Sequence, residues 1–279
     1  MRTTGLINAL TIDVEDYYHV SAFESVVGFD KWTGYESRVQ PNVEKILKIL
    51  DGRGIHATFF ILGWVGEHFP AVVRLIHKQG HEIATHGYAH RLIYSQTPEE
   101  FQADVERSLD ILENITGEKV KGYRAPSFSV TPKSLWAIEI LQAAGLRYDS
   151  SVCPARPLVH RRYGFPGAPT RPYQIAPGFW EFPVSTFRAF GRDFPVGGGG
   201  WLRHYPFGIT RWGLRRINFE GRPALVYVHP WEVDPDQPRL QGNLWRKFLH
   251  YRNLKRTAER LEVLCRDFRF ASIRDILQV

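Results

Sequence analysis

The stretch TIDVEDYYHV (Thr11–Val20) follows an apolar run at residues 7–10 and places three carboxylates, Asp13, Glu15 and Asp16, where a buried strand would end. A strand that stays regular through Glu15 would point Asp13 and Glu15 to one face and Asp16 to the other, whereas a turn beginning at Glu15 would bring Asp16 inward. Burying Asp13 without a partner would be costly, so we expect it to have a functional role. For Asp16, capping a turn is about as plausible as binding a ligand.

Short apolar runs alternate with amphipathic segments through the first half of the chain, which is the pattern of βα units around a largely parallel sheet. Thr-Pro at residues 97–98 and 131–132 marks two helix starts, the first with a glutamate that completes a capping box. Residues 153–206 mix proline, glycine, arginine and aromatic residues, which predicts long loops over a scaffold. We expect strands at residues 7–13, 55–62, 81–86, 120–126 and 223–230, and helices at residues 42–54, 70–80, 98–117, 132–145 and 243–268.

The size and composition of the chain predict a single α/β domain, since 279 residues with 43% hydrophobic content can bury a full core. A net charge of +7, from 36 Lys and Arg against 29 Asp and Glu, raises the question of a polyanionic partner. No nucleic-acid-binding motif surrounds the arginines, so we expect a solvated basic surface and no nucleic-acid partner. Attraction to an acidic polysaccharide, a membrane surface or a lipid-linked glycan stays open. The basic clusters lie at residues 156–164, 211–216 and 245–256.

Cysteine usage and the N-terminal segment favour a cytoplasmic protein. Cys153 and Cys265 match no metal-site spacing and no disulfide framework, and two ordinary thiols suit a reducing compartment. The first residues lack the long apolar segment of a signal peptide. The longest apolar run, at residues 57–66, is about half of a membrane span.

Two histidines stand four residues apart in HGYAH, at His86 and His90, directly after a predicted strand. This separation suits one helical turn that presents two imidazoles to one ion, although an isolated pair would more often be structural. A carboxylate from another strand end changes the balance, because two neutral imidazoles and one carboxylate leave positions open on a divalent cation. The sequence therefore predicts a catalytic metal site, with Glu15 or Asp16 as the carboxylate ligand.

Three further polar residues follow predicted strands. Arg124 could hold Asp13 through two parallel hydrogen bonds, or lie on the surface. His229 follows four core-type residues and could act as a general acid, or be a core histidine with internal partners. Asp149 could orient that imidazole or cap a turn. The loops after strands build the active sites of βα-barrels, so these residues are expected to share one site.

In this order, the acidic motif, H-x-x-x-H, R-x-P, the later aspartate and the aliphatic-x-His motif resemble the polysaccharide deacetylase family, the NodB-homology or carbohydrate esterase family 4 group. The resemblance covers roughly residues 7–230 and implies a distorted (β/α)₇ barrel of NodB type, with long loops in the C-terminal half and a closing C-terminal helix. Residues 13–20 and 194–207 resemble more narrowly the deacetylases associated with exopolysaccharide export and PEP-CTERM/exosortase loci. We thus expect one domain over residues 1–279, in which residues 231–279 are an extension packed on the barrel.

The resemblance also implies roles for individual residues. Asp13 matches the general base, Arg124 the arginine that steadies this base, and His229 the acid. His86 and His90 match two ligands of a divalent metal, often zinc, whose third ligand in the family is an aspartate.

Three departures stand out. T-I-D-V-E-D replaces the usual T-F-D-D-G, which leaves Glu15 or Asp16 as the metal carboxylate. Gly87 replaces a Ser or Thr that makes one loop hydrogen bond. Ser127 replaces a frequent aromatic residue, although its backbone N–H could still serve an oxyanion hole.

The implied activity is metal-dependent removal of acetyl groups, with the N-acetyl group of a hexosamine as the expected target, from a polysaccharide or lipid-linked oligosaccharide in exopolysaccharide biosynthesis. Trp201 and Trp231 could stack on sugar rings, although tryptophans are more often core residues. Two alternatives stay open: a metal-dependent amidohydrolase of small cyclic amides or ureides, and a catalytically silent sugar-binding protein. Metal content would separate the latter from a deacetylase.

Overall fold

A curled, mostly parallel sheet forms the centre of the computed structural model, which describes residues 5–155 and 164–279. Adjacent strands along the sheet are parallel except for one antiparallel pair, β6 with β7. From one end to the other the strands are β10 (Leu225–Val228), β1 (Ile7–Val14), β2 (Thr58–Ile61), β3 (Glu82–Thr85), β4 (Gly122–Tyr123), β5 (Tyr148–Asp149), β7 (Phe179–Glu181) and β6 (Tyr173–Ala176), with β11 (Arg269–Ala271) also pairing with β1.

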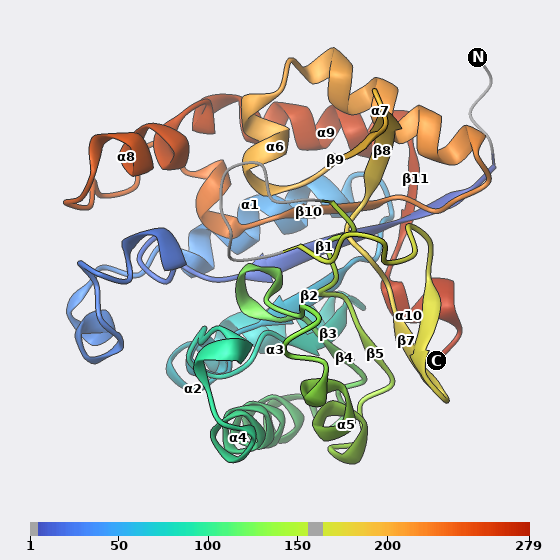
Figure 1. The fold of residues 1–279 in the computed structure, drawn as a ribbon. Coiled ribbons are helices and arrows are strands. Elements are labelled where there is room, and N and C mark those ends of the chain that lie inside the picture. The colour runs from blue at the N-terminus through green and yellow to red at the C-terminus, as the bar shows by residue number, and fades with distance from the viewer. Residues whose placement is uncertain (1–4, 156–163) are drawn as a thin grey trace.

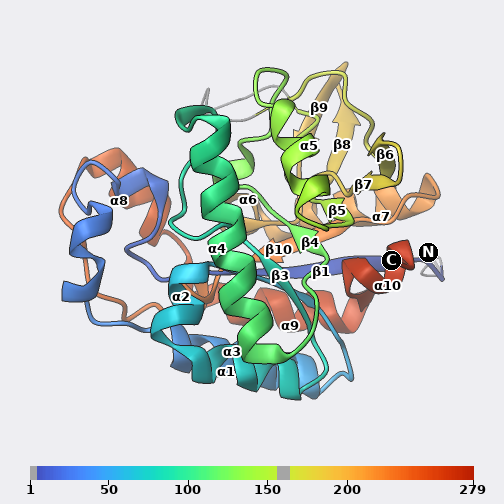
Figure 2. The ribbon, with the colours of Figure 1, turned by 90° about the horizontal axis from the view of Figure 1, so that it is seen from below.

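Helices cover the outer side of this sheet, and neighbouring helices pack against each other in the order α5, α4, α3, α1 and α9 (Figures 1 and 2). Helix α4 begins with the predicted capping box, in which Thr97 Oγ1 accepts from the Glu100 N–H and the Glu100 carboxylate accepts from the Thr97 N–H. The helices are α1 (Val39–Asp51), α2 (Gly63–His68), α3 (Pro70–Lys78), α4 (Pro98–Thr116), α5 (Trp136–Ala143), α6 (Gly199–His204), α7 (Phe207–Phe219), α8 (Leu244–Tyr251), α9 (Thr257–Asp267) and α10 (Ile273–Leu277).

The predicted α/β class and the largely parallel sheet are confirmed, and the sheet is curled (Figure 1). The loop-rich second half contains more strand than expected, because β8 (Thr186–Ala189) and β9 (Arg192–Pro195) form a separate hairpin. Beside it, Gly198 bridges Tyr227 of β10. No helix in the described ranges combines the length and the apolar character that a membrane crossing needs.

Two predicted helices differ from those in the structure. The segment at residues 132–145 becomes helical only from Trp136, so the Thr-Pro signal at residues 131–132 marks a turn before the helix. The single closing helix predicted at residues 243–268 is wrong: it is divided into α8 and α9. Asn253 between them has a φ of 59°, a left-handed conformation that an α-helix cannot continue through.

The register of the parallel strands decides where the polar residues meet. Ile12 of β1 pairs with Val228 of β10, and Thr85 of β3 pairs with Tyr123 of β4. Each of these positions is followed within one residue by a polar side chain that the sequence singled out, at Asp13, His229, His86 and Arg124. The carboxyl ends of these strands therefore form one edge, as in other βα folds.

Candidate active site

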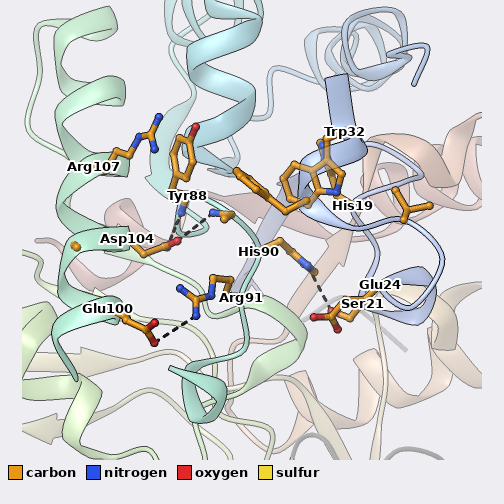
Figure 3. Close-up of a pocket in the computed structure, with 14 residues that line it drawn as sticks. His19, Ser21, Glu24, Trp32, Tyr88, His90, Arg91, Glu100, Asp104 and Arg107 are labelled. Atoms are coloured by element: carbon orange, nitrogen blue, oxygen red, sulfur yellow. Dashed lines mark hydrogen bonds and ion pairs between the residues drawn. The ribbon is translucent and has the colours of Figure 1, made fainter. Parts of the chain in front are cut away.

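Three potential metal ligands meet at this edge. Glu15, His86 and His90 each offer one atom, and these atoms lie within 4.8 Å of one another. Glu15 follows β1, and His86 and His90 belong to the loop after β3. Glu15 Oε2 lies 3.0 Å from His90 Nε2, and on the other side of the His90 ring, Nδ1 lies 3.5 Å from the Ser21 hydroxyl (Figure 3).

This set fits a divalent cation. The His86 Nδ1–H donates to the Arg124 carbonyl at 2.7 Å, which leaves Nε2 free to act as a ligand. Burial lowers the pKa of His86 to about 4, so this imidazole is neutral near pH 7, as metal binding requires. Glu15 Oε2 is buried but accepts no hydrogen bond of good geometry from the described residues. Burial opposes ionisation of Glu15, but His90 and His229 outweigh it and lower the pKa of this carboxyl well below its usual range.

The two histidines come from a loop, so the expected helical turn is wrong. Gly87 and His90 have φ values of 73° and 52°. The Asp104 carboxylate of α4 accepts from the N–H groups of Tyr88 and Ala89 at 2.7 and 3.2 Å and fixes this loop (Figure 3). A Cβ at residue 87 would lie 2.8 Å from Asp104 Oδ2. Glycine thus makes room for Asp104, a residue that sequence reasoning missed because nothing distinguishes it from other acidic residues of α4.

Asp16 is not placed to bind the ion, which corrects one of the two expected ligands. Its Oδ2 accepts from the Ser37 hydroxyl and from the N–H groups of Arg38 and Val39, at 2.7–3.1 Å. Its Oδ1 accepts from the Tyr17 N–H. Both oxygens are therefore used to anchor the first turn of α1, and Asp16 has a structural role of the capping kind.

Arg124 holds Asp13 inside the molecule. Arg124 Nη1 lies 2.6 Å from Asp13 Oδ1 and also donates to the Thr11 hydroxyl at 2.7 Å. The remaining donors go to Ser150, with Nε on its carbonyl and Nη2 on its hydroxyl. The surface alternative for Arg124 is wrong because the residue is fully buried, and the expected bidentate pair is wrong because only one guanidinium nitrogen contacts Asp13. Asp13 Oδ2 thus stays available on the side of the candidate site.

His229 faces the two carboxylates from the opposite wall. Its Nε2 lies 3.5 Å from Glu15 Oε1 and 3.8 Å from Asp13 Oδ2, and its Nδ1 lies 2.9 Å from Glu232 Oε2. Burial disfavours the imidazolium, but the neighbouring carboxylates of Glu232, Glu15 and Asp13 outweigh it and raise the pKa of His229 to about 9. In this structure His229 is therefore poised to carry a proton near neutral pH.

Glu232 orients His229, in place of the expected Asp149. Glu232 is fully buried, and its second oxygen accepts from Arg203 Nε at 2.5 Å. Sequence reasoning missed both residues, although the i,i+3 spacing of His229 and Glu232 across a proline was a usable signal. Asp149 instead accepts from the Ser151 hydroxyl and interacts with the buried Glu181, and burial raises the pKa of Asp149 above its usual range.

The two predicted sugar-stacking tryptophans differ in their surroundings. Trp231 is 4% exposed, which contradicts a role as an open stacking platform. Its indole N–H donates to Glu15 Oε1 at 3.1 Å, and its ring stacks on His229 and His250 at 5.3 and 4.1 Å between centroids. Trp201 of α6 is partly exposed beside Tyr205, and its contact with a sugar stays a prediction.

Ser127 lies near the site in an unusual backbone conformation. Ser127 and Phe128 both have positive φ, at 52° and 53°, which is uncommon for residues other than glycine and clusters at functional sites. The Ser127 hydroxyl lies 3.0 Å from the Ser21 hydroxyl, the same group that approaches His90. The turn after Arg124 is thereby tied to the ligand loop.

A cavity of about 650 Å³ opens beside His90, between the segment after β1 and helix α4 (Figure 3). Its volume falls in the range of ligand-binding pockets, which is about 300–1,000 Å³. Aromatic and charged side chains line it, among them Phe29, Trp32, Tyr88, Arg91 and Arg107. The candidate metal site thus has a neighbouring space in which a substrate can lie.

Two family models together match most of the chain. Residues 24–148 match the polysaccharide deacetylase model, and residues 150–278 match a domain of unknown function, DUF3473. The first range contains His86, His90 and Arg124, while Asp13 and Glu15 precede it and His229 follows in the second.

Several curated proteins and solved structures resemble this chain, and three of them serve as examples. The peptidoglycan deacetylase-like protein FGM2 of Gibberella zeae is 35% identical over 112 residues, which are 39% of this chain and 32% of the relative. Peptidoglycan-N-acetylglucosamine deacetylase of Bacillus cereus is 33% identical over 103 residues, 36% of this chain and 38% of the relative. The chain thus spans about a third of the length of these relatives.

The crystal structure of a putative polysaccharide deacetylase from Mycobacterium smegmatis has a TM-score of 0.65 and 22% identity, over 99% of this chain and 90% of that one. This similarity shows the fold. The family model and the curated relatives show that the chain contains a polysaccharide deacetylase domain of the NodB-homology, carbohydrate esterase family 4 type.

Proposed function

We propose that this protein is a metal-dependent deacetylase that removes the N-acetyl group of a hexosamine from a polysaccharide or lipid-linked oligosaccharide in exopolysaccharide biosynthesis. One observation carries the proposal: the largely buried cluster of Glu15, His86 and His90 lies beside a carboxylate, Asp13, and an imidazole, His229. A ligand set, a base and an acid around one point are the parts that amide hydrolysis needs.

Glu15, His86 and His90 would hold the ion, for which we propose Zn²⁺ because nitrogen and carboxylate ligands suit it. When bound, a divalent cation supplies Lewis acidity toward the acetyl carbonyl and lowers the pKa of a water from ~16 toward ~7. The protein contributes the orientation of the ligands through the Arg124 carbonyl on His86 and the Trp231 N–H on Glu15.

Asp13 is the proposed general base. Arg124 occupies one of its oxygens, and the other faces the site, where it would take a proton from the attacking water. The backbone N–H of Ser127 is the proposed second stabiliser of the developing oxyanion, and such a donor is typically worth about 3 kcal/mol in the transition state.

His229 is the proposed general acid, which would protonate the leaving amine of the sugar. Glu232 holds its Nδ1, so that Nε2 is directed toward the site and carries the proton to be donated. The base and the acid therefore stand on opposite walls, and neither has to change place during the reaction.

We also propose that both matched regions form one domain. The support is that β10 and β11, which belong to the second region, pair with β1, and that β1 pairs in turn with β2 of the first region. The parallel pairing of β10 with β1 would then place His229 beside the loop that contains His86 and His90.

The test is acetate release from a panel of acetylated glycans by protein stripped of metal and then reloaded with zinc. The proposal expects release only from the loaded protein. It also expects Asp13→Asn to keep the metal while losing acetate release. A silent sugar-binding protein would bind glycans without releasing acetate, and an amidohydrolase of cyclic amides would act on those compounds instead. Full activity of the metal-free protein would contradict the proposal.

A further inference from the structure

A helix with an exposed apolar face projects from the second half of the molecule. On α8, Leu244, Trp245 and Phe248 are 83, 58 and 46% exposed and lie within about one turn of each other. The rings of Trp245 and Phe248 stack with centroids 5.7 Å apart. Large apolar side chains gathered in this way mark an interaction surface.

The charge along this part of the sequence is of one sign. Between Asp236 and Glu259 the chain has six Lys and Arg residues and no Asp or Glu. The Arg252 guanidinium lies 5.1 Å from the centre of the Phe248 ring, and Lys255 and Arg256 follow as exposed cations. A helix with aromatic residues on one face and lysines and arginines around it is typical of segments that lie in the interface of an anionic membrane.

The opposite side of α8 is fixed to the body of the protein beside the candidate site. Arg246 Nη1 donates to the Ala22 carbonyl at 2.9 Å, and Figures 1 and 2 both show α8 next to this N-terminal segment. The buried His250 stacks on Trp231, which in turn donates to Glu15. These contacts hold α8 at a fixed position. A single side chain, Trp231, lies between His250 of this helix and the proposed metal ligand Glu15.

We propose that α8 docks the protein on an anionic lipid bilayer. Leu244, Trp245 and Phe248 enter the headgroup region, and the surrounding cations contact the lipid phosphates. A second copy of the chain would bring two basic helices together, which like-charge repulsion opposes. A nucleic acid would leave the apolar Leu244 side chain in water. A bilayer satisfies both the apolar and the basic side chains.

The experiment is co-sedimentation of the full chain with vesicles of phosphatidylcholine alone or mixed with an equal part of phosphatidylglycerol. We expect binding to the mixed vesicles that weakens as salt is raised, and weak binding to the neutral ones. The double variant Trp245→Ala, Phe248→Ala should bind about tenfold more weakly, because two interfacial side chains are lost. The matched control is Phe190→Ala, Phe219→Ala, which removes two exposed phenylalanines elsewhere and should bind like the wild type.

Acetate release from a short soluble glycan serves as a separate readout, since neither Trp245 nor Phe248 belongs to the proposed catalytic machinery. Absence of vesicle binding with intact acetate release would contradict docking alone. Absence of acetate release with intact vesicle binding would contradict the proposed function alone. Docking through α8 is overturned by equal binding to neutral and anionic vesicles, by no binding at low salt, or by an equal loss in both double variants. It is also overturned if the wild type binds no vesicles but forms dimers, and the Trp245→Ala, Phe248→Ala variant does not form them.

Discussion

The two walls of the candidate site are built in different ways. The first-half wall places Asp13 and Glu15 at the end of β1 and His86 at the end of β3, two parallel strands that β2 separates, so that the backbone register fixes their positions. The second-half wall begins at the end of β10, but a line of buried side chains supports it, in which Arg203 holds Glu232 and Glu232 holds His229. Under the proposed function the first wall would hold the ion, while the second depends on buried charges that balance one another.

Removing a ligand from the first wall should have the largest effect. His86→Ala deletes one of three ligands, so we expect metal affinity to fall by more than the ~100-fold that can follow loss of a group merely supporting a ligand. Acetate release should fall below detection. Metal analysis after dialysis, beside the acetate assay, measures both. His77→Ala, a change at a partly exposed histidine of α3, is the control and should behave like the wild type.

Breaking the second wall should mainly reduce stability. Arg203→Met leaves the buried Glu232 without its arginine, and loss of one partner of a buried pair typically costs about 3–5 kcal/mol. Denaturant unfolding measures the change. The control is Arg216→Met, which removes a half-exposed i,i+4 pair with Glu220 and should cost less than about 0.5 kcal/mol. Equal, small losses in both variants would show that the second wall does not depend on its buried charges.

A smaller and more specific loss of metal affinity is expected at the contact between the two walls, where Trp231 donates to Glu15. Trp231→Phe keeps an aromatic ring but removes the N–H that donates to Glu15. Metal affinity should fall by about 10- to 100-fold, the range seen when groups that orient ligands are lost. Titration with zinc measures it. Trp245→Phe on the exposed face of α8 is the control and should leave the zinc affinity unchanged. An equal fall in zinc affinity in both variants would contradict the proposed role of the Trp231 N–H.

The smallest effect is expected at the loop between the two histidines. Gly87→Ser restores the residue type that is usual in the family, but here it puts a side chain at φ 73° and 2.8 Å from Asp104. We expect a loss of more than about 1 kcal/mol in unfolding free energy. Gly117→Ser is matched in φ, also 73°, but has no atom within 4 Å of the added Cβ. It isolates the backbone cost, so a Gly87→Ser variant no less stable than Gly117→Ser would contradict the crowding by Asp104.

Strand ends and caps could be predicted from the sequence because they depend on local pattern. The apolar run before Asp13, the Thr97 capping box and the polar residues after β4 and β10 placed most of the site at one edge. The structural role of Asp16 could not be predicted. Its carboxylate accepts from backbone N–H groups that lie more than twenty residues later in the sequence, and only the fold brings them together.

Partners set by tertiary packing were the part that sequence reasoning missed. Nothing in the spacing of Asp104 connects it to the loop of His86 and His90, and Arg203 is far in sequence from the histidine that it supports through Glu232. The helical turn expected for the two histidines failed because their i,i+4 spacing is compatible with a loop whose glycine has positive φ.

The most direct test of the central claim compares two adjacent carboxylates. Zinc stoichiometry and acetate release are measured together for the wild type, Glu15→Gln and Asp16→Asn, with a thermal melt to establish that each is folded. The account predicts one zinc per wild-type chain, loss of zinc and activity together in Glu15→Gln, and retention of zinc in folded Asp16→Asn. A folded Glu15→Gln variant that keeps its zinc and its activity would contradict it.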